Sequence, residues 1–168
     1  MPTNFCYDYL SASKGPMRIL VIFAHPLDDG YGAALRDTVV GTLKARGHMV
    51  DLCELYKEQF DPVLSVQERR IYKDTSANFK TVSDHVQRLR QAEGVIFVFP
   101  SWWYGMPAIL KGYFDRVWLP GVAFELGRKP LSHCSVALAC LVLLQQPVHL
   151  RGSHASTWVT WRVAQAGV

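Results

Sequence analysis

The stretch Arg18-Ile-Leu-Val-Ile-Phe-Ala24 is an unbroken apolar run of strand-forming residues, and it decides the fold class. A run without polar alternation predicts a strand buried on both faces, as in the centre of a parallel sheet. Two further runs of this kind follow at Val95–Phe99 and Val136–Leu144, and the latter is too short to span a bilayer. Met49–Leu55 alternates more and predicts an edge strand of the same sheet.

Helical spacing separates these strands. Leu35, Val39 and Leu43 lie four residues apart in a predicted helix over residues 33–46, which Gly47 ends as a C-cap. Such a stripe of apolar residues packs one helix face against a sheet. The first strand is therefore followed by a helix that returns the chain to the start of the next strand.

Two further helices are predicted before the last strand. Ser65-Val-Gln-Glu68 is typical of a capping box that opens a short helix. Val82, Val86 and Leu89 mark one face of a helix that ends near Gly94. Pro107 suits the first turn of another helix. The buried stripe of that helix is expected to contain Ile109, Leu110, Tyr113, Phe114, Val117 and Trp118.

The alternation of strands and helices predicts a three-layer α/β domain with a doubly wound parallel sheet. We expect a flexible leader over residues 1–16, the domain over 17–144 and an atypical tail over 145–168. Such a sheet usually has one more helix and one more strand after the fourth strand. The pattern fails after Leu144, so these last elements are expected to be missing or altered.

Composition excludes several classes of function. The chain has 168 residues with a net charge of +4 and no Lys/Arg cluster, which argues against nucleic acid and favours anionic small molecules. The four cysteines form no C-x-x-C pair and lie at no zinc-ligand spacing from histidine, so we expect free thiols and no metal. Residues 1–16 lack the apolar core of a signal peptide, and a cytoplasmic location is expected.

Residues 25–32 connect the first strand to the first helix. In open parallel sheets, ligands bind beyond the carboxyl ends of the strands. A helix N-terminus favours phosphate, Gly30 and Gly32 allow close backbone approach, and His25 can donate to a phosphate oxygen. The loop lacks both common phosphate-binding motifs, and its two aspartates oppose an anion unless they point to solvent or cap the helix. Taken alone, this loop is better interpreted as a plain turn.

The segment Pro100-Ser-Trp-Trp-Tyr-Gly-Met-Pro107 follows the third strand. Three consecutive aromatic residues cannot all enter the core, so some are expected to line a cleft or an interface. Planar side chains and backbone amides suit a flat heteroaromatic ring. An aromatic plug over the end of the sheet explains the pattern equally well.

Both loops contribute to a resemblance. FAHPLDDGYGAAL (23–35) and VFPSWWYGMPAILKGYFDRVWLPGVAFEL (98–126) resemble the flavodoxin-like NAD(P)H:quinone oxidoreductases, which include quinone reductases and the oxidoreductases that accompany potassium-efflux systems. The similarity covers roughly residues 17–131. It implies a three-layer, flavodoxin-like, doubly wound parallel sheet. It also implies FAD or FMN as cofactor and NADH or NADPH as co-substrate.

The resemblance implies a phosphate site at the first loop. In such proteins the histidine at the position of His25 contacts the flavin phosphate. Many members continue with Ser-Phe-Asn, where this chain has Gly30, Tyr31 and Gly32. A hydroxyl and an amide are thereby lost while the backbone N–H groups remain, so we expect weaker phosphate binding.

The resemblance also implies a ring site at the second loop. The positions that match the backbone cradle of the isoalloxazine ring are Pro100, Ser101, Trp102 and Trp103. Tyr104 and Gly105 match the substrate-facing end, and Phe124 matches an aromatic residue that lines the quinone pocket, often across a homodimer interface. We therefore expect a homodimer whose aromatic surface includes Trp103, Tyr104, Trp118 and Phe124.

One departure from the family lies after the fourth strand. Members have a Thr-Thr-Gly-Gly-like loop and then a Tyr, sometimes with a His, which hold the flavin pyrimidine edge and support its charge on reduction. Here the strand ends in Leu143-Leu-Gln-Gln-Pro147, and no catalytic acid is identified. His149 and His154 are interpreted as exposed tail residues. A changed reading frame or alternative splicing near residue 132 would explain a matching front and a different tail.

The sequence thus predicts a flavin-dependent oxidoreductase that transfers hydride from NAD(P)H to a quinone or similar small acceptor. The alternative is a non-catalytic or impaired flavodoxin-like binding or regulatory subunit, which the missing loop favours. An electron-carrier flavodoxin fits less well, because carriers usually present an acidic face and this chain is basic overall.

Overall fold

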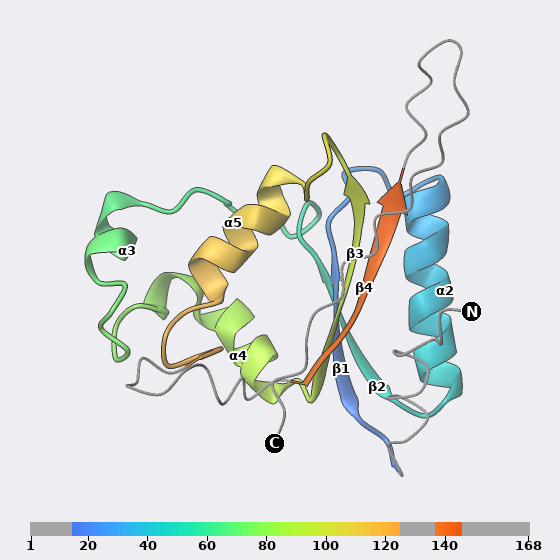
Figure 1. Ribbon diagram of the computed structural model, residues 1–168. Coiled ribbons are helices and arrows are strands. Elements are labelled where there is room, and N and C mark those ends of the chain that lie inside the picture. Colours follow the sequence, from blue (N-terminus) through green and yellow to red (C-terminus); the bar gives the residue numbers. More distant parts are fainter. Residues whose placement is uncertain (1–14, 125–136, 146–168) are drawn as a thin grey trace.

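The computed structural model describes residues 15–124 and the backbone of residues 137–145. Its strands form one parallel sheet in the order β2-β1-β3-β4 (Figure 1). They are β1 (Arg18–Phe23), β2 (Met49–Glu54), β3 (Gly94–Ser101) and β4 (Ala137–Gln145). Ile19 of β1 lies beside Val50 of β2 on one side and Gly94 of β3 on the other, so β1 is central. The predicted edge position of β2 is confirmed in this sheet.

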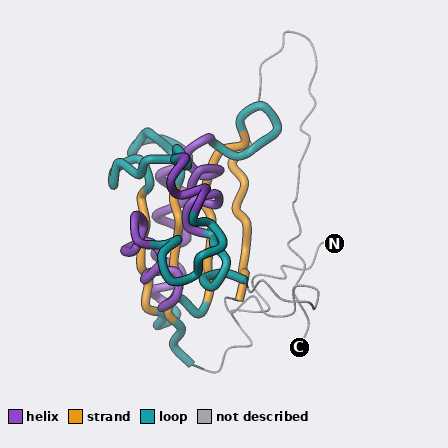
Figure 2. The backbone as a smooth tube through the Cα atoms, turned by 90° about the vertical axis from the view of Figure 1, so that its left-hand side faces the viewer, coloured by secondary structure: helices purple, strands orange, loops and turns teal. Residues whose placement is uncertain are grey.

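Helices cover both faces of the sheet. They are α2 (Tyr31–Ala45), α3 (Val66–Arg70), the 3₁₀ turn η1 (Lys80–Val82), α4 (Ser83–Gln91) and α5 (Ala108–Val117). α2 lies on one face, and α4 and α5 lie on the other (Figure 1), where they stand in front of the strands in Figure 2. The three-layer α/β architecture predicted from the alternation is therefore confirmed.

The two faces of β1 explain its unbroken apolar sequence. Ile19, Val21 and Phe23 point to the α2 layer, where Leu35, Val39 and Leu43 pack against them. The intervening residues Leu20 and Ile22 belong to the larger core on the opposite side, under α4 and α5. Because each face has its own helical layer, no position from Ile19 to Phe23 is left for a polar side chain, and only the first residue, Arg18, is exposed.

Helix ends follow the predicted signals with one difference. Gly47, with φ +83°, follows α2 as a left-handed C-terminal residue should. Ser65 and Glu68 form the predicted capping box of α3. α2 begins at Tyr31, two residues before the predicted start, because Gly30 with φ +89° sets the turn into the helix. A glycine in this conformation carries none of the usual side-chain signals of an N-cap.

A buried ion pair ties α3 to α5. The Glu68 carboxylate is buried and accepts hydrogen bonds from Arg116 at 2.6 Å and from the Thr81 hydroxyl at 2.7 Å. Its other oxygen accepts from the Ser65 backbone N–H at 2.7 Å. Every oxygen of this carboxylate thus has a partner, which a buried charge requires.

α5 also has a close approach to the loop that follows β2. A Cβ atom at Gly112 would lie 2.2 Å from the Pro62 carbonyl oxygen and 2.5 Å from its Cα. Only glycine leaves room for the loop at this position of the helix.

The predicted leader and tail fall almost wholly outside the described residues, so these two expectations stay predictions. Within the part of the chain that the structure describes, no helix is long and apolar enough to cross a membrane.

Candidate functional site

The carboxyl ends of β1 and β3 lie side by side, and both predicted ligand loops leave from this edge. The chain continues from β1 to β2 on one side and later to β3 on the other, so the gap between β1 and β3 is a topological switch point. His25 lies in the loop after β1 and Trp102 directly follows β3, and their ring centroids are 6.1 Å apart. The structure therefore brings together two loops that are about 75 residues apart in sequence.

His25 is held in one orientation. Its Nδ1 lies 3.1 Å from the Leu27 backbone nitrogen and 3.2 Å from the Leu27 carbonyl oxygen, and its ring stacks near Phe23 with centroids 6.2 Å apart. Nδ1 accepts from the Leu27 N–H in one tautomer and donates to the Leu27 carbonyl in the other. In the tautomer with the proton on Nε2, His25 can donate a hydrogen bond to an anion.

The N-terminus of α2 is open to an anion. Among the described residues no side chain makes a cap hydrogen bond to it, and its first turn contains no acidic residue. A Cβ placed on Gly30 would meet nothing within 4 Å, so space is free above the first turn. Tyr31 is exposed and Gly32 is buried, with both in helical conformation. The free N–H groups and the helix dipole together attract negative charge at this point.

The two aspartates of the loop do not occupy this space as helix caps. Asp28 and Asp29 are exposed, and Asp28 pairs with Arg36 at 3.4 Å. Arg36 also pairs with Glu54 at 2.8 Å and lies over the Phe23 ring at 4.9 Å. Asp28 also lines the cavity beside His25, so its carboxylate opposes an anion on that side of the loop, and the pair with Arg36 offsets part of this charge.

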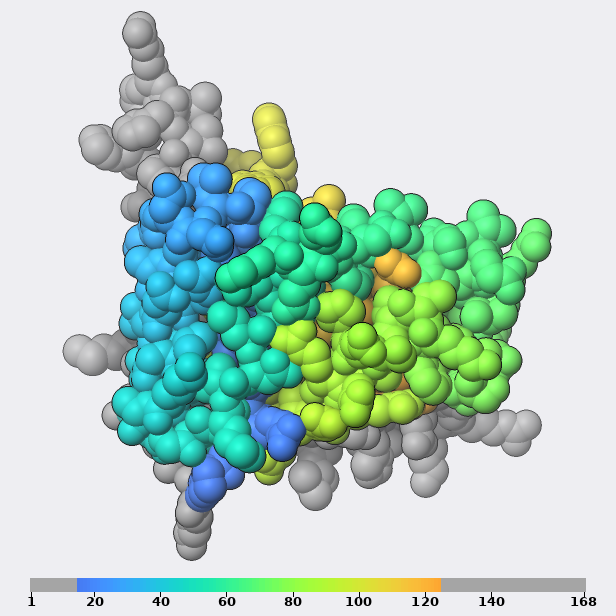
Figure 3. Space-filling view, turned by 180° about the vertical axis from the view of Figure 1, so that it is seen from behind, coloured from blue at the N-terminus to red at the C-terminus, as the bar shows by residue number. Residues whose placement is uncertain are grey.

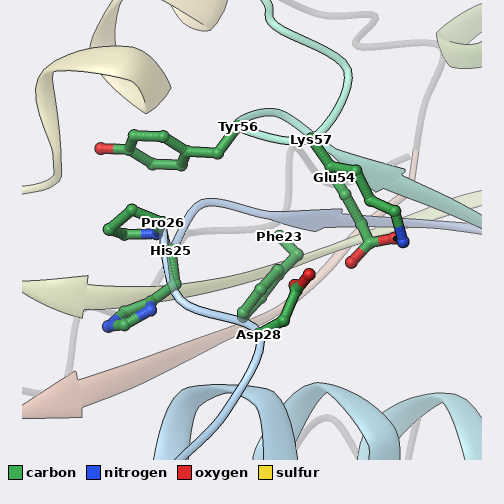
Figure 4. A pocket seen from close by; sticks show the side chains of 7 residues that line it. All are labelled: Phe23, His25, Pro26, Asp28, Glu54, Tyr56 and Lys57. Atoms are coloured by element: carbon green, nitrogen blue, oxygen red, sulfur yellow. Dashed lines mark hydrogen bonds and ion pairs between the residues drawn. The ribbon is translucent and has the colours of Figure 1, made fainter.

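A small cavity adjoins His25 on the side of β2 (Figure 4). Its volume is about 140 Å³, and its lining residues are Phe23, His25, Pro26, Asp28, Glu54, Tyr56 and Lys57. Whole sites for small molecules usually measure roughly 300–1,000 Å³. The cavity is therefore too small by itself to hold a whole ligand of that size.

The aromatic segment after β3 forms a tight, strained turn. Trp102 and Gly105 exchange two backbone hydrogen bonds of 3.0 Å, and the residues between them have φ values of +49° at Trp103 and +60° at Tyr104. Large side chains rarely adopt this conformation, which costs each of them about 1–2 kcal/mol. Strain of this kind is concentrated at binding and catalytic sites.

The same turn projects its side chains outward. Trp103 is 97% exposed and Tyr104 is 83% exposed. Figure 3 shows the yellow segment around residue 103 standing out from the edge beside the blue β1–α2 loop. The interpretation of these residues as an aromatic plug over the sheet is therefore wrong, because a plug would be buried.

The backbone of the turn limits which amides can serve a ligand. The N–H groups of Trp102 and Gly105 are used within the turn, whereas no described residue accepts from Trp103 or Tyr104 N–H. Pro100 is buried inside β3, and Ser101 is half-buried at its end. A ring cradle in this segment would thus consist of the Trp102 side chain and the two central amides of the turn.

Phe124 and Trp118 lie away from these loops within one chain. α5 starts directly after the aromatic segment, and its ten residues carry the chain about 15 Å before Trp118 is reached. Trp118 packs against Phe97 and Phe114, and both Trp118 and Phe124 are half-buried against the main core. They add less exposed aromatic surface than the sequence predicted, because the apolar face of α5 continues past the end of the helix at Val117 and both side chains pack against the core.

Sequence reasoning missed the charged wall of the cavity. Arg36, Glu54 and Lys57 form one ion-pair group beside His25, with Lys57 at 3.2 Å from Glu54. Glu54 ends β2, and the carboxyl end of a parallel strand beside a ligand loop was an available signal.

The residues present fit a flavin. An uncapped helix N-terminus with a histidine donor suits the phosphate, and an aromatic ring with free amides suits the flat isoalloxazine system. These features meet at the β1/β3 switch point, which is the usual place for a nucleotide in this strand order.

Comparison with known proteins finds relatives that are named as oxidoreductases. An Escherichia coli protein named as an uncharacterized NAD(P)H oxidoreductase, YcaK, is 34% identical over 67% of this chain and 58% of its own length. The ribosyldihydronicotinamide dehydrogenase-like protein traD of Penicillium crustosum is 36% identical over 66% of this chain and 47% of its own length. The chain thus spans about half the length of these curated relatives.

A solved structure and a family model match the fold of this chain. The NAD(P)H:quinone oxidoreductase from Methanothermobacter marburgensis superposes with a TM-score of 0.69 at 26% identity, over 78% of this chain and 66% of the other. The model of the flavodoxin-like fold family matches residues 17–142. Because this match covers most of the chain and the strand order is consistent with it, the chain belongs to the family of proteins with the flavodoxin-like fold.

Proposed function

We propose that this protein is a flavin-dependent oxidoreductase that transfers hydride from NAD(P)H to a quinone or a similar small acceptor. The observation that carries the proposal is the meeting of His25, the open N-terminus of α2 and the Trp102 turn at one edge of the sheet. The names of its relatives support the nicotinamide and quinone parts of the proposal.

Each group at the edge has a distinct task. His25 donates from Nε2 to a phosphate oxygen, and the first N–H groups of α2 add further bonds to the same phosphate. Trp102 and the amides of Trp103 and Tyr104 orient the ring system. Bound flavin supplies the capacity to accept a hydride and pass two electrons on. Tyr104 and Gly105, at the exposed tip, face the acceptor.

A homodimer would complete this open site. One chain leaves Trp103 and Tyr104 almost fully exposed, and it places Phe124 at the far end of α5. Phe124 can therefore line the acceptor pocket only from a second copy. We place the activity in the cytoplasm, which suits a buried free thiol such as Cys53.

The alternative of a binding subunit with little turnover rests on a specific pairing. Ser101 at the end of β3 lies beside Gln145 at the end of β4. The segment that follows Gln145 therefore begins at the edge of the proposed flavin site. In this chain that segment lacks the Gly-Gly loop and Tyr that the family resemblance implies. Loss of one preorganised donor typically lowers rates by about 10²–10³.

One set of measurements tests both functions. Purified protein should show flavin absorption or gain thermal stability with FAD or FMN, and it should oxidise NAD(P)H with a simple benzoquinone. A chimera that takes its residues after Ser132 from a full-length relative should turn over about 10²–10³ faster per bound flavin. Protein that neither carries flavin nor responds to it contradicts the whole proposal. Equal turnover of the two proteins shows that the tail does not limit catalysis.

A further inference from the structure

Cys53, Glu58 and His85 come together under α4, near the carboxyl end of β2, and none of the three lines the cavity beside His25. Cys53 is near the end of β2, Glu58 is in the following turn and His85 is in α4. The Cys53 Sγ lies 3.5 Å from Glu58 Oε2 and 3.8 Å from His85 Nδ1, and all three donor atoms lie within 4.8 Å of one another. Ligands of a tetrahedral zinc ion, at bond lengths of 2.0–2.3 Å, are separated by about 3.3–3.6 Å. The three donors thus stand near this spacing already.

The surroundings hold the three donors in place. Cys53 is buried in the core, and the His85 ring packs edge-on against Phe60 with centroids 4.9 Å apart. The backbone N–H of Glu58 donates to the Glu54 carbonyl at 2.8 Å, while Glu54 N–H donates to the Glu58 carboxylate at 3.1 Å. Little rearrangement is therefore needed to bring these ligands to a metal.

The charges nearby suit a dication. Before a metal binds, Asp51 and Glu58 carry two negative charges and Arg88 carries one positive charge, while burial raises the pKa of the Cys53 thiol and keeps it protonated. Loss of the thiol proton on metal binding adds a third negative charge. Arg88 binds Asp51 in a bidentate manner at 2.7 and 2.9 Å and donates to the Leu52 carbonyl at 2.8 Å. Arg88 also donates from Nη1 to both Glu58 oxygens at 3.0 and 2.9 Å, so a Glu58 oxygen that turns to a metal gives up one of these bonds. The bonds to Asp51 and Leu52 keep the guanidinium paired when it does so.

A buried polar group beside the cluster lacks a partner. The Tyr113 hydroxyl is fully buried and has no hydrogen-bond partner among the described residues. Its ring lies edge-on to His85 with centroids 5.7 Å apart. An unmade bond of this kind costs about 1–3 kcal/mol, and a metal-bound water would supply the missing partner.

We propose that Cys53, Glu58 and His85 bind a divalent transition-metal ion of the zinc class, with water as the fourth ligand beside Tyr113. On binding, the Cys53 S–H bond breaks, the proton goes to solvent, and the sulfur forms the metal–thiolate bond with no change of oxidation state. Borderline metals prefer this mixture of thiolate, imidazole and carboxylate. The sequence predicted no metal because the ligands are 5 and 32 residues from Cys53, which matches no short motif.

The metal would stiffen one wall of the proposed flavin site. Glu54, Tyr56 and Lys57 lie between the ligands Cys53 and Glu58 in sequence, and all three line the cavity beside His25. A metal bridging the two ends of this turn restricts its motion. The inference does not depend on the proposed oxidoreductase activity, because it rests on ligands outside that site.

Cobalt(II) titration of the full chain tests the site. A background in which Cys6, Cys134 and Cys140 are replaced by Ser leaves Cys53 as the single thiol. We expect one Co²⁺ per chain with a near-ultraviolet thiolate-to-cobalt absorption band, and a higher melting temperature with Zn²⁺. Cys53→Ala should abolish the band, and Cys53→Ser serves as a second variant of similar size.

The histidine ligand has a matched control. His85→Gln should weaken Co²⁺ binding by about tenfold or more, whereas His48→Gln should leave it unchanged, because His48 lies at the opposite end of the sheet, beside Met17. Melting curves without metal establish that each variant folds. A band that survives Cys53→Ala, or an affinity that His85→Gln does not alter, overturns the proposal. A background protein that binds no Co²⁺ overturns it as well.

Discussion

The carboxyl edge of the sheet around His25 and the α3–α5 junction differ in whether their polar groups have hydrogen-bond partners. At the junction, the buried Glu68 carboxylate has a partner for both oxygens. At the edge, no described side chain caps the N-terminus of α2. Trp103 and Tyr104 adopt positive φ angles in a strained turn, and their side chains are almost fully exposed. Unused bonding capacity and strain are thus concentrated where a ligand is proposed to bind, while the satisfied charges serve stability.

Removal of Glu68 should have the largest effect on stability. Glu68→Ala removes the carboxylate 2.6 Å from the half-buried Arg116, which keeps a longer pair with Asp61 at 3.6 Å, and we expect a loss of about 3 kcal/mol in the free energy of unfolding. Asp115→Ala is the matched control on the same helix, because its pair with Lys111 is exposed and should contribute less than about 0.5 kcal/mol. Urea denaturation measures both. Equal losses would erase the contrast between the two regions.

The same carboxylate predicts a dependence of stability on pH. Burial alone would raise the pKa of Glu68, but hydrogen bonds from Thr81, Ser65 and Arg116 outweigh it and lower the pKa from 4.5 to about 2. A lowered pKa in the folded state means that the stabilisation is complete above pH 4.5 and is lost as the pH falls toward 2. Glu68→Gln should flatten this part of the stability profile. An unchanged slope would show that other carboxylates govern acid unfolding.

At the edge, replacement of His25 should affect binding and leave stability nearly unaltered. A charge-assisted bond to phosphate contributes roughly 1.5–3 kcal/mol, so His25→Ala should weaken flavin binding by about tenfold to a hundredfold. Leu27→Ala, in the same loop and exposed, is the control. Fluorescence titration with FMN and FAD measures the affinity. If His25→Ala binds as tightly as the control, His25 is a turn residue with no ligand role.

Relief of strain in the aromatic turn should have the smallest effect on the free energy of unfolding. It should raise stability, whereas removal of Glu68 lowers it. Trp103→Asn combined with Tyr104→Gly supplies residues that adopt positive φ readily, so we expect the protein to become more stable by about 1 kcal/mol. Flavin affinity or turnover should fall in the same variant. Thermal unfolding and flavin titration check the two parts. A variant that gains stability and keeps full function would assign the strain no role in binding.

Much of the fold could be predicted because local signals agree with the global arrangement. The doubly buried strand Arg18–Phe23 and the capping box at Ser65 each follow from short-range pattern. The start of α2 was missed because the positive φ angle of Gly30 sets the turn into the helix. Glycine also occurs with other φ angles, so its presence in the sequence does not mark a helix start. The exposure of Trp118 was overestimated because its packing depends on Phe97, a residue of another element.

The two candidate ligand loops could be named from the sequence, whereas the long-range contacts around them could not. The approach of His25 to Trp102 requires β1 and β3 to be neighbours, which the family resemblance implied and periodicity could not. Arg36 and Glu54 meet because α2 and β2 flank the same strand. Cys53 and His85 are likewise joined by tertiary packing, and no spacing rule along the chain reaches that far.

The close contact between Gly112 and Pro62 has a consequence for how this chain can vary. Even alanine at position 112 would place its Cβ within 2.5 Å of three Pro62 atoms, two of them backbone. The helix cannot adapt by rotating a side chain, so the path of the whole loop would have to change with it. Mutational libraries should therefore leave position 112 untouched, and across homologous sequences its identity should covary with the length of the loop around Pro62.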